Sequence, residues 1–288
     1  MTPEPMTPAS DLAPLIAQLA KREDQHKYDH GHAVILSGGP GEGGAARLAA
    51  RGALRIGAGL VTLACPLPAL AENAARMDTV LLRPLHDSRA LARMLEDRRY
   101  NALCLGPGMG FERARDMVPV ALGSGRGVVV DADALSAHAA DPEALFAHCG
   151  PHAVLTPHGG EFRRLFPDLA ERVAGNPEAV LRQAAARAGA VVLLKGARTV
   201  IAAPDGALAV SDATGPRAAP WLATAGSGDV LSGIITGLLA RGFTAFDAAR
   251  LGTFLHVEAA RAFGPGLIAS DLHESLPQVL RNLAANGG

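Results

Sequence analysis

The chain has 288 residues, of which 49% are hydrophobic and 19% are charged, and its formal net charge at pH 7 is −1. This composition is typical of a globular protein with a sizeable core. The even mixture of charges excludes a basic surface that would bind nucleic acid and a polybasic patch that would bind a membrane. No apolar run is long enough to span a membrane and no signal-peptide pattern opens the chain, so we expect a cytoplasmic protein that acts on small molecules.

The N-terminal segment has no pattern of a compact domain before residue 30. Prolines at positions 3, 5 and 8 predict a disordered lead over residues 1–9, and residues 12–20 have the pattern of a short amphipathic helix. We therefore expect an N-terminal extension over residues 1–25, partly disordered, followed by one domain over residues 26–288.

Short apolar runs alternate with helical patterns through most of the chain. Strands are predicted at residues 33–37, 60–65, 102–105, 127–130, 153–155 and 190–194. Helices are predicted at residues 45–56, 68–76, 88–98, 112–122, 142–148, 161–166 and 177–188. Short, continuously apolar strands separated by helices predict an α/β fold whose sheet is mainly parallel and has helices on both faces.

The last third of the chain has a different pattern. Residues 199–203 and 207–210 flank Pro204-Asp205-Gly206, a turn sequence that predicts a hairpin and hence an antiparallel edge to the sheet. Three helices follow, at residues 228–241, 245–263 and 271–284. We find no internal repeat and no linker that would divide the chain into two domains.

The three cysteines lie in or near apolar runs, at Cys65, Cys104 and Cys149. Their spacing has none of the close pairing that zinc or redox motifs require. We expect reduced cysteines that serve as core residues.

Polar and glycine residues follow the last apolar residue of four predicted strands, at Gly106, Asp131, His158 and Lys195. The carboxyl ends of parallel strands meet at one edge of a sheet, and open α/β sheets bind their ligands in the crevice there. These four positions are therefore predicted to lie together. Taken singly, each could equally be a residue that ends a strand or caps a turn.

Two of these positions can be interpreted further. Lys195 follows four apolar residues, so its stem is expected along the sheet with its ammonium group in the cleft, where it would offset phosphate charge. His158 can donate a hydrogen bond to an amide or a pyrophosphate, although a single histidine after a proline is often a turn residue. The loop Gly38–Gly44 has the spacing of neither a Walker A motif nor a dinucleotide fingerprint, but it could pass closely over a phosphate or a ribose.

The most informative stretch is residues 223–240, where a glycine-rich turn leads directly into an apolar segment of helical length. The first amides of a helix have no partner within it and carry partial positive charge, so Ala225, Gly226, Ser227 and Gly228 can direct their N–H groups at a phosphate oxygen. A carboxylate at Asp229 would repel that anion unless it acts on a neutral hydroxyl, which indicates a general base. The alternative is that Asp229 is only an acidic residue in the first turn of a helix.

In this order, these segments resemble one family: the ADP/ATP-dependent NAD(P)H-hydrate dehydratases of the ribokinase-like superfamily. The resemblance extends over about residues 26–280, nearly the whole chain. Its motifs are His26-Lys27, the loop 38–44, residues 54–62, Gly106-Pro-Gly108, Asp131-Ala-Asp133-Ala134-Leu135, Thr156-Pro-His158 with Glu161-Phe162, Lys195-Gly196 with Thr199, Gly226-Ser-Gly-Asp229 with Leu231 and Gly233, and residues 267–271.

The resemblance implies a ribokinase-like fold and the repair of the hydrated, dead-end S-forms of NADH and NADPH, with loss of water driven by ADP or ATP. It implies that Asp229 is the base and that the amides of Gly226, Ser227 and Gly228 hold the developing charge. It assigns the hydrate to Ala45, Gly108, His158 and Asp229. It assigns the adenine nucleotide to Lys195, Gly196, Ala197, Arg198, Thr199 and Gly228.

The same resemblance implies that Mg²⁺ bridges the nucleotide's phosphates, and no residue of the chain is assigned as a metal ligand. We expect a homo-oligomer, either a dimer or a tetramer. Many relatives carry an N-terminal epimerase domain, for which the roughly 25 residues before the match are too few. The sequence departs from the family pattern at Pro40, where we expect serine, and at Ala225, where glycine is common.

Two other functions are compatible with these motifs. A kinase for a vitamin or a sugar in the same superfamily would use the same acid and the same anion site, but it would leave a stable phosphorylated product. A nucleotide-binding regulator without catalysis would not need Asp229 in an intact glycine turn.

Overall fold

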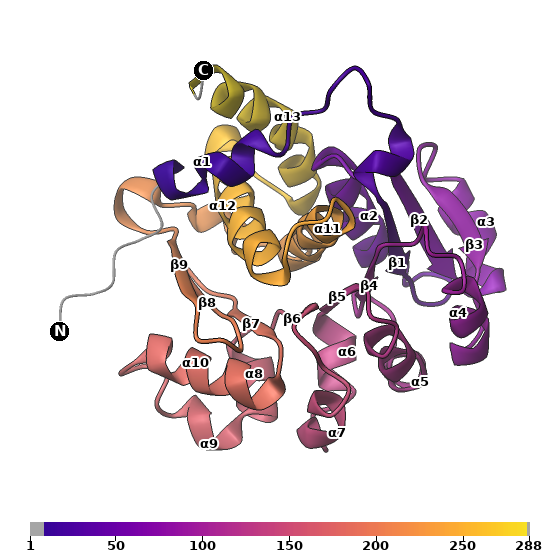
Figure 1. Ribbon diagram of the computed structural model, residues 1–288, viewed down its shortest axis with the longest axis horizontal. Coiled ribbons are helices and arrows are strands. Elements are labelled where there is room, and N and C mark those ends of the chain that lie inside the picture. The colour runs from indigo at the N-terminus through magenta and orange to yellow at the C-terminus, as the bar shows by residue number, and fades with distance from the viewer. Residues whose placement is uncertain (1–8, 287–288) are drawn as a thin grey trace.

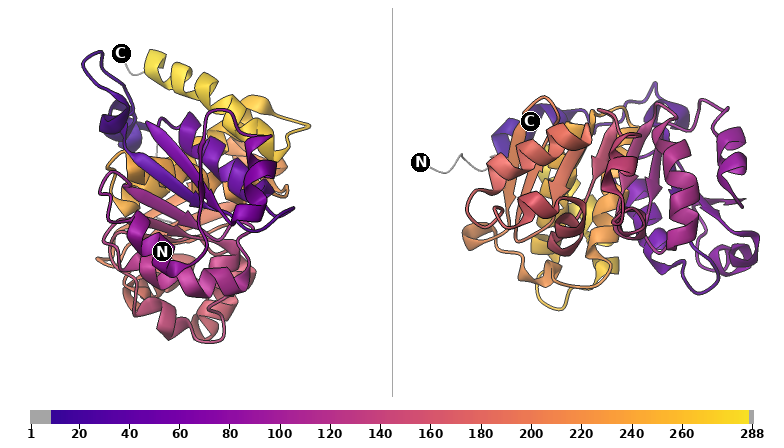
Figure 2. Two further views of the ribbon diagram at one scale, coloured as in Figure 1. Left: turned by 90° about the vertical axis from the view of Figure 1, so that its right-hand side faces the viewer. Right: turned by 90° about the horizontal axis from the view of Figure 1, so that it is seen from below.

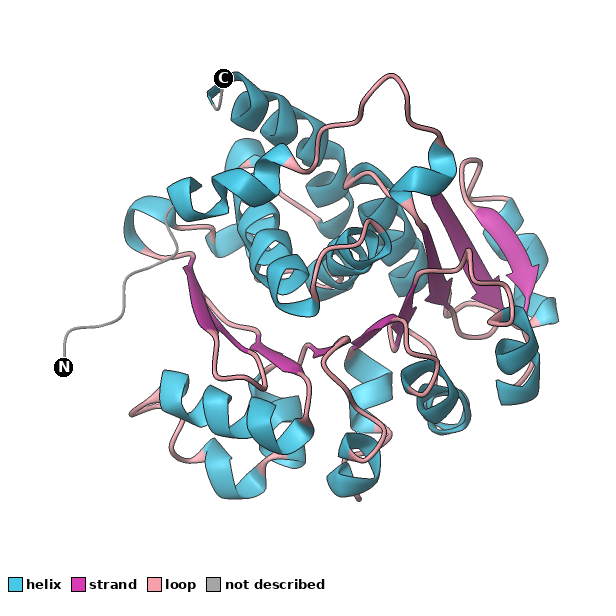
Figure 3. Ribbon diagram, viewed as in Figure 1, coloured by secondary structure: helices cyan, strands magenta, loops and turns pink. Residues whose placement is uncertain are grey.

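A computed structural model describes residues 9–286 of the chain. Its strands form one nine-stranded sheet in the order β3-β2-β1-β4-β5-β6-β7-β8-β9, drawn as a single twisted layer between helices in Figure 3. The strands are β1 (His32–Leu36), β2 (Leu60–Cys65), β3 (Leu81–Pro84), β4 (Ala102–Leu105), β5 (Gly127–Val130), β6 (Ala153–Leu155), β7 (Val191–Leu194), β8 (Arg198–Ala202) and β9 (Leu208–Asp212).

The sheet is parallel from β3 to β7 and antiparallel from β7 to β9, as the sequence predicts. The central strands read as continuous apolar runs because helices cover both of their faces. In β1, Ala33 and Ile35 belong to one hydrophobic core and Val34 and Leu36 to another, since successive side chains of a strand point to opposite faces.

The helices form two layers, one on each side of the sheet (Figure 1). One face is covered by α1 (Ala9–Ala17), α2 (Gly44–Arg55), α11 (Ser227–Ala240), α12 (Ala245–Phe263) and α13 (Ala269–Asn286). The other is covered by α4 (Ser88–Met94), α5 (Phe111–Leu122), α6 (Ala132–Ser136), α7 (Pro142–Phe146), α8 (Gly159–Leu165), α9 (Pro167–Ala170) and α10 (Pro177–Ala188). The left view of Figure 2 shows the C-terminal helices, in yellow, and the magenta helices on opposite sides of the strands.

The short helices complete the chain. Helix α3 (Leu70–Ala74) lies next to the edge strand β3, and four 3₁₀ turns occur among the described residues. These are η1 (Lys27–His30), η2 (Leu67–Ala69), η3 (Gly215–Arg217) and η4 (Pro220–Leu222).

Helix α11 packs closely against α2, and glycines make this contact possible. A Cβ built on Gly233 would lie 2.0 Å from the carbonyl oxygen of Ala49, and one built on Gly237 would lie 2.7 Å from that of Ala53. Only a residue without a side chain fits such a contact. The contact fixes the depth and direction at which α11, which carries Asp229, enters the molecule.

Most predicted elements occur within a few residues of their expected bounds. The helix predicted at residues 12–20 is α1, whose Leu12 and Leu15 are buried in the first core. The disordered lead predicted for residues 1–9 lies, except for Ala9, outside the described residues.

All three cysteines are free; Cys65 and Cys104 are buried and Cys149 is half-buried. No helix among residues 9–286 has both the length and the hydropathy to cross a membrane.

Among the described strands and α-helices, three short ones were not predicted from the sequence: β3, α6 and α9. Strand β3 is an edge strand and largely exposed, so its residues show neither a buried run nor an alternation. Helix α6 begins directly after Asp131, in a segment that the sequence pattern marks only as the end of a strand. Helix α9 has only four residues, too few for a helical period.

Candidate active site

The four polar or glycine positions that follow predicted strands do meet at one edge of the sheet. Lys195 Nζ donates to Asp131 Oδ1 at 2.6 Å. His158 and Lys195 form an isolated parallel bridge, and the Lys195 N–H donates to the Pro157 carbonyl at 2.9 Å. A Cβ on Gly106 would lie 1.8 Å from the carbonyl oxygen of Asp131, so the ends of β4 and β5 are in direct contact.

The glycine turn at the start of α11 faces the same edge. Gly226 precedes the helix with φ of 87°, a conformation that favours glycine. A Cβ at this position would also lie 2.7 Å from Leu48 Cδ1 and 2.9 Å from Ala269 Cβ. The turn therefore requires glycine for both its conformation and its surroundings, and it presents the first amides of a long helix to the cleft.

Asp229 lies in the first turn of α11, where the sequence predicts a general base. Burial and the negative charge of Asp131 raise the pKa of the Asp229 carboxyl to about 6, although the Lys195 ammonium group opposes this rise. Asp133 adds a smaller effect in the same direction as Asp131. A carboxylate of this proton affinity is ionised at neutral pH and accepts a proton more readily than an ordinary aspartate.

A buried histidine holds the first residue of α11 in place. His256 Nε2, from α12, lies 2.9 Å from the carbonyl oxygen of Ser227 and 3.2 Å from its Oγ. Burial lowers the pKa of His256 to about 4, so the ring is neutral at pH 7 and Nε2–H donates to the Ser227 carbonyl. This role could not be predicted from the sequence, because His256 lies on the apolar face of a helix and precedes no loop.

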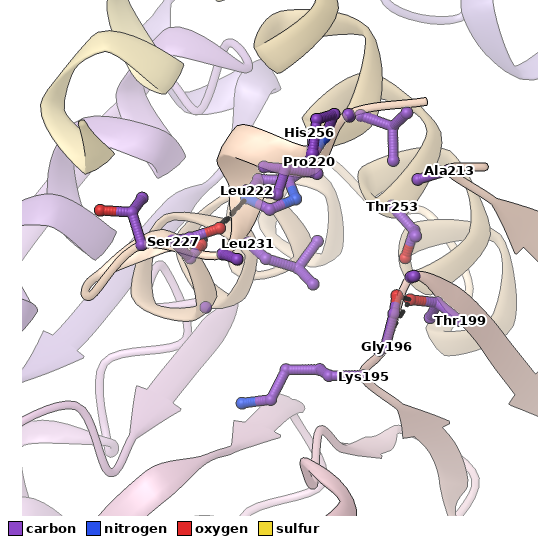
Figure 4. A pocket seen from close by; sticks show the side chains of 16 residues that line it. Lys195, Gly196, Thr199, Ala213, Pro220, Leu222, Ser227, Leu231, Thr253 and His256 are labelled. Atoms are coloured by element: carbon purple, nitrogen blue, oxygen red, sulfur yellow. Dashed lines mark hydrogen bonds between the residues drawn. The ribbon is translucent and has the colours of Figure 1, made fainter. Parts of the chain in front are cut away.

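A cavity of about 610 Å³ opens between the end of β7, the start of α11 and helix α12. Figure 4 shows Lys195 on one side of it and Ser227 and His256 on the other. The cavity is large enough for an adenine nucleoside, and its walls are mostly apolar. It is lined by Lys195, Gly196, Ala197, Thr199, Ala213, Ala219, Pro220, Leu222, Ala223, Thr224, Ser227, Gly228, Leu231, Thr253, His256 and Val257.

Five of the six positions that the resemblance assigns to the nucleotide line this cavity. Thr199 Oγ1 donates to the Gly196 carbonyl at 3.0 Å, which closes the loop between β7 and β8. Arg198 is the exception, because it is not among the lining residues and its guanidinium group pairs with Glu178 on α10.

Two of the positions assigned to the hydrate, Ala45 at the start of α2 and Gly108 after β4, lie next to each other. A Cβ on Gly108 would lie 3.6 Å from Ala45 Cβ and 2.6 Å from the Glu42 carbonyl oxygen. The glycine loop before α2 and the loop after β4 are thus in contact. Ala45 lies one helical turn before Leu48, whose Cδ1 would lie 2.7 Å from a Cβ on Gly226, so the start of α2 borders the turn that carries Asp229.

His158 has a structural contact of its own. Its Nδ1 accepts hydrogen bonds from the amides of Gly160 and Glu161, at 2.9 Å and 3.4 Å, and so caps α8. Its Nε2 lies 3.5 Å from Glu161 Oε1, and 57% of its side chain is exposed. In the neutral ring Nε2 carries the proton, because Nδ1 is the acceptor. His158 is therefore a residue that caps α8, and its Nε2–H lies near the Glu161 carboxyl group of the same helix.

Ser232 is a member of this group that the sequence did not reveal. Its Oγ donates to Asp131 Oδ2 at 2.6 Å, and its residue is fully buried. Because Ser232 follows Asp229 by three residues, both lie on one face of α11. That spacing is the signal from which Ser232 could have been predicted.

Known proteins similar to this chain belong to the family that its sequence resembles. A model of the NAD(P)H-hydrate dehydratase family matches residues 33–278. The bifunctional NAD(P)H-hydrate repair enzyme Nnr of Moorella thermoacetica is 41% identical over 286 residues, which cover 93% of this chain and 52% of that protein. The chain spans about half the length of the curated relatives it matches.

Solved structures give the same result. The ADP/ATP-dependent NAD(P)H-hydrate dehydratase of Bacillus subtilis, co-crystallized with ATP and Mg²⁺, has a TM-score of 0.79 and 26% identity, covering 98% of this chain and all of that one. A ribokinase-like superfamily protein of Enterococcus faecalis has a TM-score of 0.76 at 21% identity, covering 93% and 94% of the two chains. The predicted ribokinase-like fold is confirmed.

Proposed function

The chain belongs to the NAD(P)H-hydrate dehydratase family, and we propose that it removes water from the S-form of hydrated NADH or NADPH at the expense of ADP or ATP. The observation that carries this proposal is the position of Asp229. It is a carboxylate of raised pKa, in the first turn of a helix whose amides face a cleft, beside a cavity of nucleoside size.

The proposed reaction has two steps. In the first, Asp229 takes the proton of the hydroxyl group on the hydrated ring carbon, and the oxygen attacks the terminal phosphorus of the nucleotide. The new O–P bond forms as the bond to the next phosphate breaks, and the amides of Gly226, Ser227 and Gly228 stabilise the charge that develops.

In the second step, the electron pair of the ring nitrogen expels phosphate from the ring carbon. Loss of a proton from the adjacent carbon then restores the double bond of the reduced nicotinamide. The products are the intact dinucleotide, inorganic phosphate and a nucleotide shortened by one phosphate.

The described residues fit the nucleotide and its metal in different ways. The apolar cavity fits the nucleoside, and Lys195 and the start of α11 fit phosphates. We propose that Mg²⁺ arrives on the phosphates, whose oxygens are the ligands it prefers, and that it neutralises charge between them.

The assay that tests this proposal measures the recovery of reduced-nicotinamide absorbance. Purified protein is incubated with hydrated NADH or hydrated NADPH, Mg²⁺ and either ADP or ATP. Recovery that requires a nucleotide supports the proposal, and the four combinations give the preferred donor and substrate. A stable phosphorylated hydrate would instead indicate a kinase, and nucleotide binding without turnover would indicate a regulator; either result would contradict the proposal.

We further propose that residues 26–288 form the catalytic unit and that the protein acts in the cytoplasm as a homo-oligomer, a dimer or a tetramer. Light scattering after size-exclusion chromatography measures the mass of the assembly. A monomer with full activity would rule out the oligomer.

A further inference from the structure

Asp131 is held rigidly at the end of β5. Its side chain is 1% exposed, and its two oxygens accept from Lys195 Nζ and Ser232 Oγ, each at 2.6 Å. Its N–H donates to the Leu105 carbonyl at 3.0 Å. The next residue, Ala132, has φ of 44° and is the only non-glycine residue with positive φ among residues 9–286. A strained backbone next to a fully bonded carboxylate is typical of a functional site.

The Lys195 ammonium group lies between the Asp131 carboxylate and the first turn of α11, where the phosphates of the proposed nucleotide would bind. It bonds to Asp131 in this structure, but a Cβ on Gly228 would lie only 3.3 Å from Nζ. The ammonium group is therefore next to the first turn of α11, where a phosphate would bind, and the Lys195 side chain lines the nucleotide cavity. Its flexible stem allows it to turn from one partner to the other without movement of the backbone.

The groups that face Asp229 come from several elements and are mostly acidic. Asp131 and Asp133, at the end of β5 and the start of α6, raise the pKa of Asp229, and Lys195 lowers it. Burial raises the pKa of Glu161 on α8, Lys195 lowers it and Asp131 raises it, so the Glu161 carboxyl group lies near both of these side chains. Two histidines border the same cluster: His158, whose Nε2 lies 3.5 Å from Glu161 Oε1, and the neutral, buried His256, whose pKa is lowered by burial and by Lys195.

We propose that Asp131 is a positioning residue that neutralises Lys195 in the free protein and yields it to the nucleotide's phosphates, so that nucleotide binding makes Asp229 a stronger base. This inference rests on the proposed function for the identity of the nucleotide. Once Lys195 has turned to the phosphates, Asp131 remains fixed by Ser232 and the Leu105 carbonyl. The positive charge of Lys195 is then paired with the phosphates and offsets less of the negative charge of Asp131 at Asp229, and two neighbouring carboxylates hold a proton more tightly than one.

The coupling restricts strong base catalysis to the state in which a phosphate acceptor is present. Without a nucleotide, the Lys195 charge moderates Asp229. With a nucleotide bound, Asp229 takes the hydroxyl proton more readily, at the moment when the oxygen has a phosphorus atom to attack.

The test is a titration of Asp229 that needs no hydrate and no turnover. Protein labelled with ¹³C at the aspartate carboxyl groups is titrated by NMR, with Asp229→Asn used to assign the signal. The wild type is measured alone and with the non-hydrolysable analogue AMP-PNP and Mg²⁺. We expect the analogue to raise the proton affinity of Asp229 about tenfold.

Charge variants separate the coupling from simple repulsion by the phosphates. In the free protein, Asp131→Asn should lower the proton affinity of Asp229 and Lys195→Met should raise it, whereas Ser232→Ala, which keeps all charges, should leave it nearly unchanged. With the analogue, the rise should be much smaller in Asp131→Asn than in the wild type. Equal rises in the two proteins, or shifts of the same sign in Asp131→Asn and Lys195→Met, would overturn the proposal.

The Lys195→Met variant keeps the test decisive if Asp131→Asn does not fold, because Lys195 is partly exposed and its loss leaves the buried bond between Asp131 and Ser232 intact. In this variant the analogue should add little to a proton affinity that is already high; a rise as large as that of the wild type would contradict the coupling. Failure of the dehydratase assay together with the expected titrations would reject the proposed function and leave the coupling in place.

Discussion

His256 Nε2 donates to the carbonyl oxygen of Ser227 at 2.9 Å, and this bond joins the middle of α12 to the first residue of α11. Both residues are buried, and both line the cavity assigned to the nucleotide. Under the proposed function the first amides of α11 hold phosphate, which requires a helix start that does not fray, and a side chain from another helix anchors this one. The contact leads to our first prediction.

Replacing His256 with phenylalanine keeps most of the volume and removes the hydrogen bond. We expect a loss of about 1–2 kcal/mol in the free energy of unfolding and a roughly tenfold rise in the KM for the nucleotide, because the first turn of α11 loses its anchor. Denaturant unfolding and steady-state kinetics measure the two effects. The exposed His152 provides the control, since His152→Phe should change neither quantity.

The same histidine predicts a pH dependence of stability. Its pKa is about 4 in the folded protein, below its ordinary value of 6.5, so the unfolded chain binds more protons and stability falls as the pH drops below 6.5. Between pH 7 and pH 5 this one group should cost about 2 kcal/mol. The raised pKa of Asp229 acts with the opposite sign, so the contribution must be isolated by difference.

Denaturant unfolding of the wild type and of His256→Phe at pH 7 and pH 5 gives that difference. The wild type should lose about 2 kcal/mol more than the variant over this range. Equal losses in the two proteins would show that His256 is not buried in its neutral form.

Asp229→Asn should abolish turnover but keep nucleotide binding. Removal of a general base is expected to lower kcat by about 10²–10⁴-fold, whereas the nucleotide cavity keeps its lining residues. Single-turnover kinetics and calorimetry measure the two quantities. Asp133→Asn is the matched control: this acid also faces Asp229, and its substitution should leave most of the activity.

The activity of the wild type should depend on pH through the same carboxyl group. Because the base acts in its ionised form and its pKa is about 6 in the free protein, kcat/KM for the nucleotide should fall as the pH drops below about 6. A profile that stays flat down to pH 4.5 would count against Asp229 as the base.

Gly233→Ala should be strongly destabilising although the change is small. The new Cβ would lie 2.0 Å from the Ala49 carbonyl oxygen, so α11 must move away from α2, and we expect a loss of about 2–4 kcal/mol together with reduced activity. Thermal unfolding measures the loss. Gly150→Ala is the control, because nothing lies within 4 Å of a Cβ at that position and its φ is ordinary.

Much of the fold followed from the sequence because its signals are local. The strands at residues 102–105, 127–130 and 153–155 are short apolar runs that end in glycine or polar residues, and the structure has them with the same bounds. The edge strand β3 escaped prediction because an exposed strand has no buried pattern. Helix α6 escaped it because its five residues span little more than one turn.

The sequence alone also placed the candidate site in the fold. Residues at the ends of parallel strands must meet at one edge of the sheet, and a glycine turn before an apolar helix must present free amides, so Asp131, Lys195 and Asp229 could be placed at one cleft. Only the tertiary structure decided which of them touch. Lys195 and Ser232 both donate to Asp131, and His256 donates to Ser227. These contacts could not be predicted, because the paired residues are 29 to 101 residues apart and their distance depends on the depth at which α11 and α12 pack on the sheet. That depth is set by side-chain packing between helices, which no local pattern encodes.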